Sequence, residues 1–172
     1  MDKPIETVVY ELLKKNKYTL TTAESCTGGM IASTLVNVPG ISEFFQEGYV
    51  TYSDAAKTKM IGVPENIISE HGVVSIETAA AMAEAAARTA NTDTSVSVTG
   101  IAGPDGGTED CPVGLVFIGC YINGHTVTER HVFPGDRMQV RKAACNRALQ
   151  LLTEMISKES LIAEGNSGQI LT

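Results

Sequence analysis

A serine and a cysteine stand side by side in the run TTAESCTGG, residues 21–29, directly before a glycine pair. The residues before this run favour a strand and those after it favour a helix, which predicts Ser25 at a strand-to-helix turn. A hydroxyl at such a turn can attack a substrate, can bind an anion together with the neighbouring amides, or can simply cap the helix. The local sequence leaves these three interpretations open.

Lys57 is the candidate base for Ser25. A serine attacks efficiently only when a base removes its proton, and none of the three histidines has an evident place for this task. A helix that begins at Ser53 or Asp54 puts Lys57 in its first turn, where the helix dipole disfavours a second positive charge. Burial would lower the lysine pKa further, and such a lysine can serve a Ser-Lys pair. The alternative is an ordinary solvated lysine.

Two neighbours of this pair have competing interpretations. Cys26 could itself be the nucleophile, because a thiol at a helix N-terminus has a lowered pKa. It has no recognisable histidine partner, however, and free cysteines are often simply buried, so the residues favour Ser25. Tyr52, at the end of the preceding predicted strand, could hydrogen-bond the pair or stack on a ring. It could equally be a half-buried strand aromatic.

Two further segments have the composition of a binding site. The run TGIAGPDGG, residues 99–107, follows a predicted strand and is rich in glycine, which is typical of a binding loop. Arg137 and Arg141 are four residues apart, so they share one face of a helix and could bind a phosphate. The alternative for the arginines is a solvated helix face. Asp105 and the acidic residues after it are interpreted as loop solvation.

The bulk composition excludes several classes of protein. With 172 residues, a net charge of -7 and a pI near 4.9, the chain is not expected to bind nucleic acid non-specifically. No apolar run is long enough to span a membrane, and the start MDKPIETVVYELLKK resembles an amphipathic helix rather than a secretion signal. The four cysteines lack metal-ligand spacing, so we expect reduced thiols, no metal site and a cytoplasmic location.

The elements that must position these residues alternate along the chain. Helices are predicted at 4–16, 30–38, 54–61, 76–90 and 136–158, with a helical turn at 65–70, and strands at 18–23, 48–52 and 94–98, followed by a hairpin around Asn123-Gly124. This order predicts an α/β fold: a three-layer α/β/α sandwich with a mixed, mostly parallel sheet and a C-terminal hairpin. One domain should cover residues 1–160, and the polar tail 161–172 is expected to be frayed or disordered. If the first three strands are parallel neighbours, the loops after them converge.

Five segments in this order resemble the CinA C-terminal domain family: TTAESCTGG, GYVTYSDAAKTKMIGV, HGVVS, SVTGIAGPDGGTEDCPVGLVFIG and VFPGDRMQVRKAA. The resemblance covers residues 4–155, and stand-alone members of the family are nicotinamide-nucleotide amidases. It implies hydrolysis of nicotinamide mononucleotide to nicotinate mononucleotide and ammonia, in pyridine-nucleotide salvage, without metal or organic cofactor. It also implies a homodimer or higher homo-oligomer. The alternatives are a non-catalytic pyridine-nucleotide-binding module or an amidase for another amide.

The same resemblance assigns roles to individual residues. It makes Ser25 the nucleophile and Lys57 its base, places Tyr52 in the substrate site and puts Thr99 beside the oxyanion. We expect the amides of the TGG turn to help Thr99 hold the oxyanion. Substrate contacts are expected at Glu24, Cys26, Thr27, Gly28, Gly29, Gly100, Ala102, Gly103, Arg137 and Arg141.

Overall fold

Five strands form one mixed sheet in the order β2-β1-β3-β4-β5 in the computed structural model, which describes residues 3–167. The strands are β1 (Leu20–Glu24), β2 (Phe45–Val50), β3 (Thr94–Gly100), β4 (Leu115–Ile122) and β5 (His125–Val132). β1 pairs in parallel with β2 and β3, whereas β4 runs antiparallel to both β3 and β5. The predicted mixed sheet with a terminal hairpin is confirmed. Parallel pairing, however, is confined to the first three strands.

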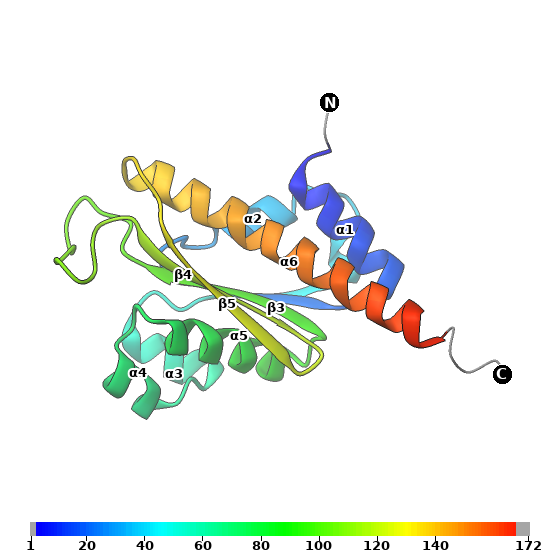
Figure 1. The fold of residues 1–172 in the computed structure, drawn as a ribbon, viewed down its shortest axis with the longest axis horizontal. Coiled ribbons are helices and arrows are strands. Elements are labelled where there is room, and N and C mark those ends of the chain that lie inside the picture. Colours follow the sequence, from blue (N-terminus) through cyan, green and yellow to red (C-terminus); the bar gives the residue numbers. More distant parts are fainter. Residues whose placement is uncertain (1–2, 168–172) are drawn as a thin grey trace.

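Helices cover both faces of the sheet, as the three-layer prediction required (Figure 1). One face carries α1 (Ile5–Asn16), α2 (Met30–Leu35) and α6 (Arg137–Ser167), and the other carries α3 (Asp54–Ile61), α4 (Glu65–His71) and α5 (Ile76–Ala90). The larger apolar core lies under α1, α2 and α6, and a smaller one lies under α3 and α5. Both sides of β1 and β3 are therefore buried, which fixes the strands that lead into the candidate loops.

The alanine-rich α5 packs unusually close to the sheet because its neighbours there are small. The hydroxyls of Ser95 and Ser97 donate hydrogen bonds of 2.6 Å to the carbonyls of Ala83 and Ala79. A Cβ atom on Gly119 of β4 would lie 2.5 Å from the Ala79 carbonyl oxygen, so only glycine fits there. This close contact holds β3, and the loop that follows it, at a fixed height against α5.

Most predicted boundaries agree with the structure to within a few residues. Ser75 caps α5 by accepting from the amide of Thr78, and Asn123-Gly124 forms the hairpin turn with positive φ at both residues. α2 ends at Leu35 rather than Val38, because the next residues form turns with i→i+3 hydrogen bonds. α6 continues to Ser167, beyond the predicted end at 158. Residues 161–167 of the predicted tail are thus helical, and residues 168–172 lie outside the described part.

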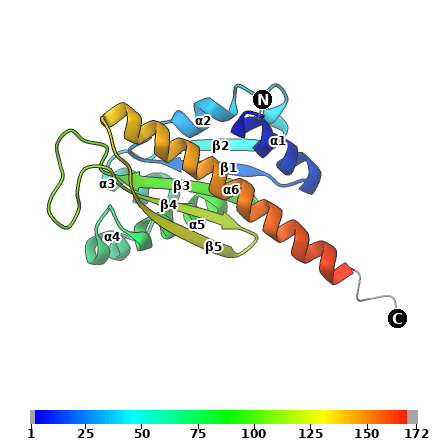
Figure 2. The same cartoon turned by 45° about the horizontal axis from the view of Figure 1, so that its top comes forward.

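The loops after β1, β2 and β3 meet at one edge of the sheet. These strands are parallel neighbours, so their carboxyl ends lie together and the loops that follow them converge. α6 begins beside the long loop that connects β3 to β4 (Figure 2), and the Arg137 guanidinium donates to the Gly103 carbonyl within that loop. The segments with candidate chemistry thus share one place in the fold.

Candidate active site

Ser25 and Lys57 lie within hydrogen-bonding distance of each other. Lys57 Nζ is 3.3 Å from Ser25 Oγ and 3.0 Å from the carbonyl oxygen of Thr51, to which it donates. The two side chains come from different elements: Ser25 follows β1, and Lys57 lies in the first turn of α3. Ser53 caps that helix by accepting from the amide of Ala56. The structure therefore brings together the two residues that the sequence singled out as nucleophile and base.

Burial makes Lys57 suitable as a base. Its side chain is only 1% exposed, and this loss of solvent lowers the pKa of Lys57 from its ordinary value. The negative charge of Asp54 and the Cys26 thiol oppose the lowering without cancelling it. A lysine whose pKa moves towards neutrality has a larger fraction of unprotonated amine, which can accept a proton from Ser25.

Cys26 lies beside Ser25 but lacks the character of a nucleophile. The thiol is 5% exposed, and burial raises the pKa of Cys26 to about 11, although Arg141, Arg137 and Lys57 act in the opposite direction. A group with this pKa remains a thiol at neutral pH, and only the thiolate is strongly nucleophilic. The electrostatics of the site thus favour Ser25, as the sequence did.

The turn after Ser25 uses its glycine amides internally, which corrects part of the predicted oxyanion site. The amide of Gly28 donates to the Ser25 carbonyl, and the amide of Gly29 donates to the Glu24 carboxylate, each at 3.0 Å. Neither is therefore free to hold an oxyanion. The amide of Cys26, in contrast, donates to no other residue among 3–167.

Glu24, predicted as a substrate contact, caps α2 from inside the protein. Its carboxylate is 1% exposed and also accepts from the amides of Ile31 and Ala32 at 3.0 and 2.9 Å. A negative charge at a helix N-terminus is favourable, and three backbone donors satisfy it. Neither Glu24 nor the residues Thr27, Gly28 and Gly29 line the cavity described next. They shape the turn rather than the substrate site.

A cavity of about 270 Å³ opens in front of Ser25 and Lys57. Gly100, Ala102 and Gly103 line it from the β3–β4 loop, as predicted. At its open end Tyr52 is 59% exposed, and its hydroxyl accepts a 2.8 Å hydrogen bond from Arg137. Ile101 and Gly106, from the predicted binding loop, line it too, as does Asp105, which was expected only to solvate that loop. Three further lining residues, Asp54, Val73 and Val74, were not predicted from the sequence. Asp54 could have been predicted, because it lies one helical turn before Lys57 and therefore on the same face of the helix.

Thr99 lines the same cavity, but its hydroxyl is already engaged. Thr99 Oγ1 donates a 2.6 Å hydrogen bond to the carbonyl of Val73, the residue that leads towards α5. The hydroxyl therefore has no proton left for an oxyanion, which argues against the predicted role. Thr99 instead ties the end of β3 to the segment before α5.

Arg137 and Arg141 share a helix face, yet they contact different things. Arg137 lines the cavity and donates to Gly103 and Tyr52. Arg141 lies behind the turn of residues 25–29, which we call the nucleophile turn after the proposed role of Ser25. Its Nε donates to the Cys26 carbonyl at 3.0 Å, and its Nη2 donates to the Thr27 carbonyl at 2.7 Å. Only Arg137 is therefore placed to meet a ligand, and Arg141 supports the turn.

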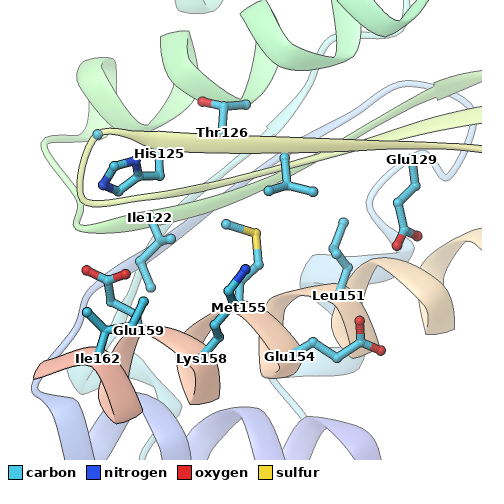
Figure 3. Close-up of a pocket in the computed structure, with 12 residues that line it drawn as sticks. Ile122, His125, Thr126, Glu129, Leu151, Glu154, Met155, Lys158, Glu159 and Ile162 are labelled. Carbon is cyan, nitrogen blue, oxygen red and sulfur yellow. The ribbon is translucent and has the colours of Figure 1, made fainter. Parts of the chain in front are cut away.

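A larger cavity lies elsewhere, between β5 and α6 (Figure 3). It measures about 650 Å³ and combines apolar side chains such as Leu151 and Met155 with the charged Glu154 and Lys158. Its lining hydroxyl, on Thr126, donates a 2.8 Å hydrogen bond to the exposed Glu84 carboxylate, and no buried lysine is among its lining residues. Size alone therefore does not identify the reactive site. Within residues 3–167, no helix combines the length and apolarity that a membrane crossing needs, and no three acidic, histidine or cysteine side chains gather as a metal site.

Solved structures with this arrangement of elements are known. The competence damage-inducible protein A from Klebsiella pneumoniae superposes with a TM-score of 0.85 at 34% identity, over 89% of this chain and 95% of that one. A CinA superfamily protein from Escherichia coli superposes with a TM-score of 0.81 at 38% identity, over 87% and 90% of the two chains. The fold and the sequence are thus shared over nearly the whole domain.

Sequence comparison gives the same result. A competence-damage inducible protein of Clostridium beijerinckii is 54% identical over 157 residues, 91% of this chain, and a CinA-like protein of Kosmotoga olearia is 47% identical over 151 residues. The chain spans only 38% and 37% of the lengths of these two relatives. The model of the CinA C-terminal domain matches residues 2–156. The chain therefore belongs to the CinA C-terminal domain family.

Proposed function

We propose that this chain hydrolyses the carboxamide of nicotinamide mononucleotide, releasing ammonia and nicotinate mononucleotide. The observation that carries the proposal is the buried Lys57 amine, 1% exposed and 3.3 Å from Ser25 Oγ. A buried lysine beside a serine is costly to retain for stability alone, because its charge loses solvation. The same burial gives the lysine a useful role as a general base.

The chemistry follows from this geometry. Neutral Lys57 accepts the Ser25 proton while Oγ attacks the carboxamide carbon, and the carbonyl oxygen becomes an oxyanion. The protonated Lys57 then donates its proton to the leaving nitrogen, so ammonia departs and an acyl-enzyme remains. A water molecule, deprotonated by Lys57, attacks the ester, and Lys57 returns that proton to Ser25 as the acid product leaves. The acid then ionises to nicotinate mononucleotide and gives its remaining proton to the released ammonia or to bulk water. The overall reaction consumes one water for each amide cleaved.

The oxyanion needs donors other than those the sequence suggested. We assign the amide of Cys26, the residue after the nucleophile, which donates to no other residue among 3–167. A preorganised amide of this kind typically stabilises the transition state by about 3 kcal/mol. Gly28 and Gly29 contribute by holding the turn through their contacts with Ser25 and Glu24, and Arg141 holds its carbonyls.

The open end of the cavity suits the nucleotide portion of this substrate. Arg137 uses one Nη atom on Gly103 and the other on Tyr52, and a guanidinium has five N–H groups, so donors remain for a phosphate. Binding the remote phosphate would orient the carboxamide towards Ser25, which lowers the entropic part of the barrier. A cation at this position allows a protein with a net charge of -7 to bind an anionic substrate.

Ammonia release from nicotinamide mononucleotide tests the proposal, together with chromatographic identification of nicotinate mononucleotide. We expect turnover by the purified chain without added metal or cofactor. Thermal stabilisation by the nucleotide without any ammonia would instead identify a non-catalytic nucleotide-binding module. Ammonia from other amides in a substrate panel, but not from this nucleotide, would identify an amidase of different specificity.

A further inference from the structure

The charges that line the cavity do not match a purely anionic ligand. Two carboxylates, Asp54 and Asp105, line it together with the cationic Arg137 and with Lys57, whose amine is proposed to act in the neutral form. Carboxylates repel a phosphate, so a site built only for an anion would not place two of them in its lining. The cavity instead has the composition expected for a ligand that carries both signs of charge.

The two carboxylates come from different elements, Asp54 from α3 and Asp105 from the β3–β4 loop. Asp54 is three residues before Lys57 in α3, which places both on one helix face and puts Asp54 beside the reacting pair. Its negative charge opposes the lowering of the Lys57 pKa that burial causes. Asp105 follows shortly after Gly103, whose carbonyl accepts a hydrogen bond from Arg137. The carboxylate of Asp54 therefore accompanies the reacting pair, and that of Asp105 lies in the loop that Arg137 contacts.

The ordinary explanation for Asp54 is helix stabilisation, because an acidic residue in the first turn interacts favourably with the helix dipole. Glu65 occupies the same first-turn position in α4, is likewise exposed, and does not line this cavity. The dipole accounts for an acidic residue at both positions, but only Asp54 also lines the cavity with Ser25 and Lys57. Glu65 also supplies a matched control.

We propose that Asp54 makes the site selective for a positively charged pyridinium ring over a neutral ring of the same shape. The inference rests on the proposed function, in which the carboxamide is attached to such a ring. A ring bound with its carboxamide at Ser25 lies next to Asp54, and the carboxylate attracts the ring cation. The same carboxylate repels the negative charge of the nicotinate product, which favours product release.

Binding measurements separate this selectivity from catalysis. Calorimetry on the Ser25→Ala chain, which cannot form the acyl-enzyme, gives Kd for nicotinamide mononucleotide and for its reduced dihydropyridine form. The two ligands share phosphate, ribose and carboxamide and differ in the ring charge. We expect the oxidised form to bind more tightly, so that Kd of the reduced form divided by Kd of the oxidised form exceeds one. Ser25→Ala/Asp54→Asn should reduce this ratio about fivefold, a modest change because Asp54 is exposed. The Kd of nicotinate mononucleotide, divided by the Kd of nicotinamide mononucleotide, should also be smaller in Ser25→Ala/Asp54→Asn than in Ser25→Ala.

The control Ser25→Ala/Glu65→Gln should leave both ratios unchanged. An unchanged ratio in the Asp54 variant overturns the inference. A ratio that responds only to Asp105→Asn also overturns it, and so does a failure of both ligands to bind at millimolar concentration. The ammonia assay on the unsubstituted chain is a separate measurement. Absence of turnover with an Asp54-dependent Kd ratio would contradict the proposed function and still support the selectivity.

Discussion

Ser25 and Lys57 occupy one end of the cavity with 9% and 1% of their surfaces exposed, whereas Tyr52 at the other end keeps 59% of its surface in solvent. Burial at the first end lowers the pKa of Lys57 and raises that of Cys26, which favours Ser25 over Cys26 as the proposed nucleophile. At the open end, Arg137 is exposed. Under the proposed function, the buried end carries out the reaction and the open end binds the substrate. Substitutions should separate kcat from KM accordingly.

The strongest test of the buried end is Ser25→Ala. We expect kcat to fall by about 10⁴-fold or more, because the acyl-enzyme can no longer form. The thermal midpoint should change little, since the substitution removes one hydroxyl. Cys26→Ala is the matched control and should retain at least roughly a tenth of the rate, because the thiol is protonated and buried. Loss of activity in Cys26→Ala with survival in Ser25→Ala would reverse the assignment of the nucleophile.

Lys57→Met tests whether burial of the amine serves catalysis. We expect kcat to fall by about 10³-fold, the contribution of a positioned general base. Burial lowers the pKa of folded Lys57, so the unfolded chain binds more protons between the folded and unfolded pKa values, and the free energy of unfolding of the parent chain rises with pH through that window. Below the lowered pKa the full burial penalty is present.

Lys57→Met should lack this rise, and the exposed Lys59→Met should keep both the rise and the activity. Denaturant titrations at a series of pH values measure the difference. An identical pH dependence in the parent chain and Lys57→Met would show that Lys57 is not the group whose pKa burial lowers.

A smaller effect should distinguish the two arginines. Arg137→Gln should raise KM for nicotinamide mononucleotide by about tenfold or more, because a charge-assisted contact to phosphate is lost, with little change in stability. Arg141→Gln should leave KM nearly unchanged but lower kcat and destabilise the fold by about 2 kcal/mol, because two carbonyls of the nucleophile turn lose their donor. Steady-state kinetics and thermal unfolding of both variants measure the split. Equal KM effects would place both arginines on the ligand.

Short-range signals explain why the central pair could be predicted from the sequence. The strand-to-helix turn at Ser25 and the Ser53 cap before Lys57 are local patterns, and the resemblance in motif order joined them. The convergence of the three loops depended only on parallel neighbouring strands. Local patterns also allowed the fold class, the α5 boundaries and the hairpin turn to be predicted.

The errors concern partners that only the folded chain brings together. The Glu24 carboxylate binds amides on the next helix rather than a substrate, and Thr99 donates to a carbonyl 26 residues earlier. Arg141 contacts Cys26, 115 residues away, although its spacing from Arg137 suggested a common target. Residue type predicted that these groups would make polar contacts, but it could not identify the partner. The length of α6 was underestimated because its end lacks an early proline or glycine stop.

The bonds from Arg141 to the nucleophile turn also bear on the order in which a growing chain becomes active. Ser25 is synthesised early, yet the guanidinium that fixes the carbonyls of Cys26 and Thr27 leaves the ribosome more than a hundred residues later. Ser25, the proposed nucleophile, therefore acquires these supporting contacts around its turn only after the final helix has docked. Nested truncations within α6, assayed for ammonia release, would locate the point at which a nascent polypeptide becomes a working enzyme.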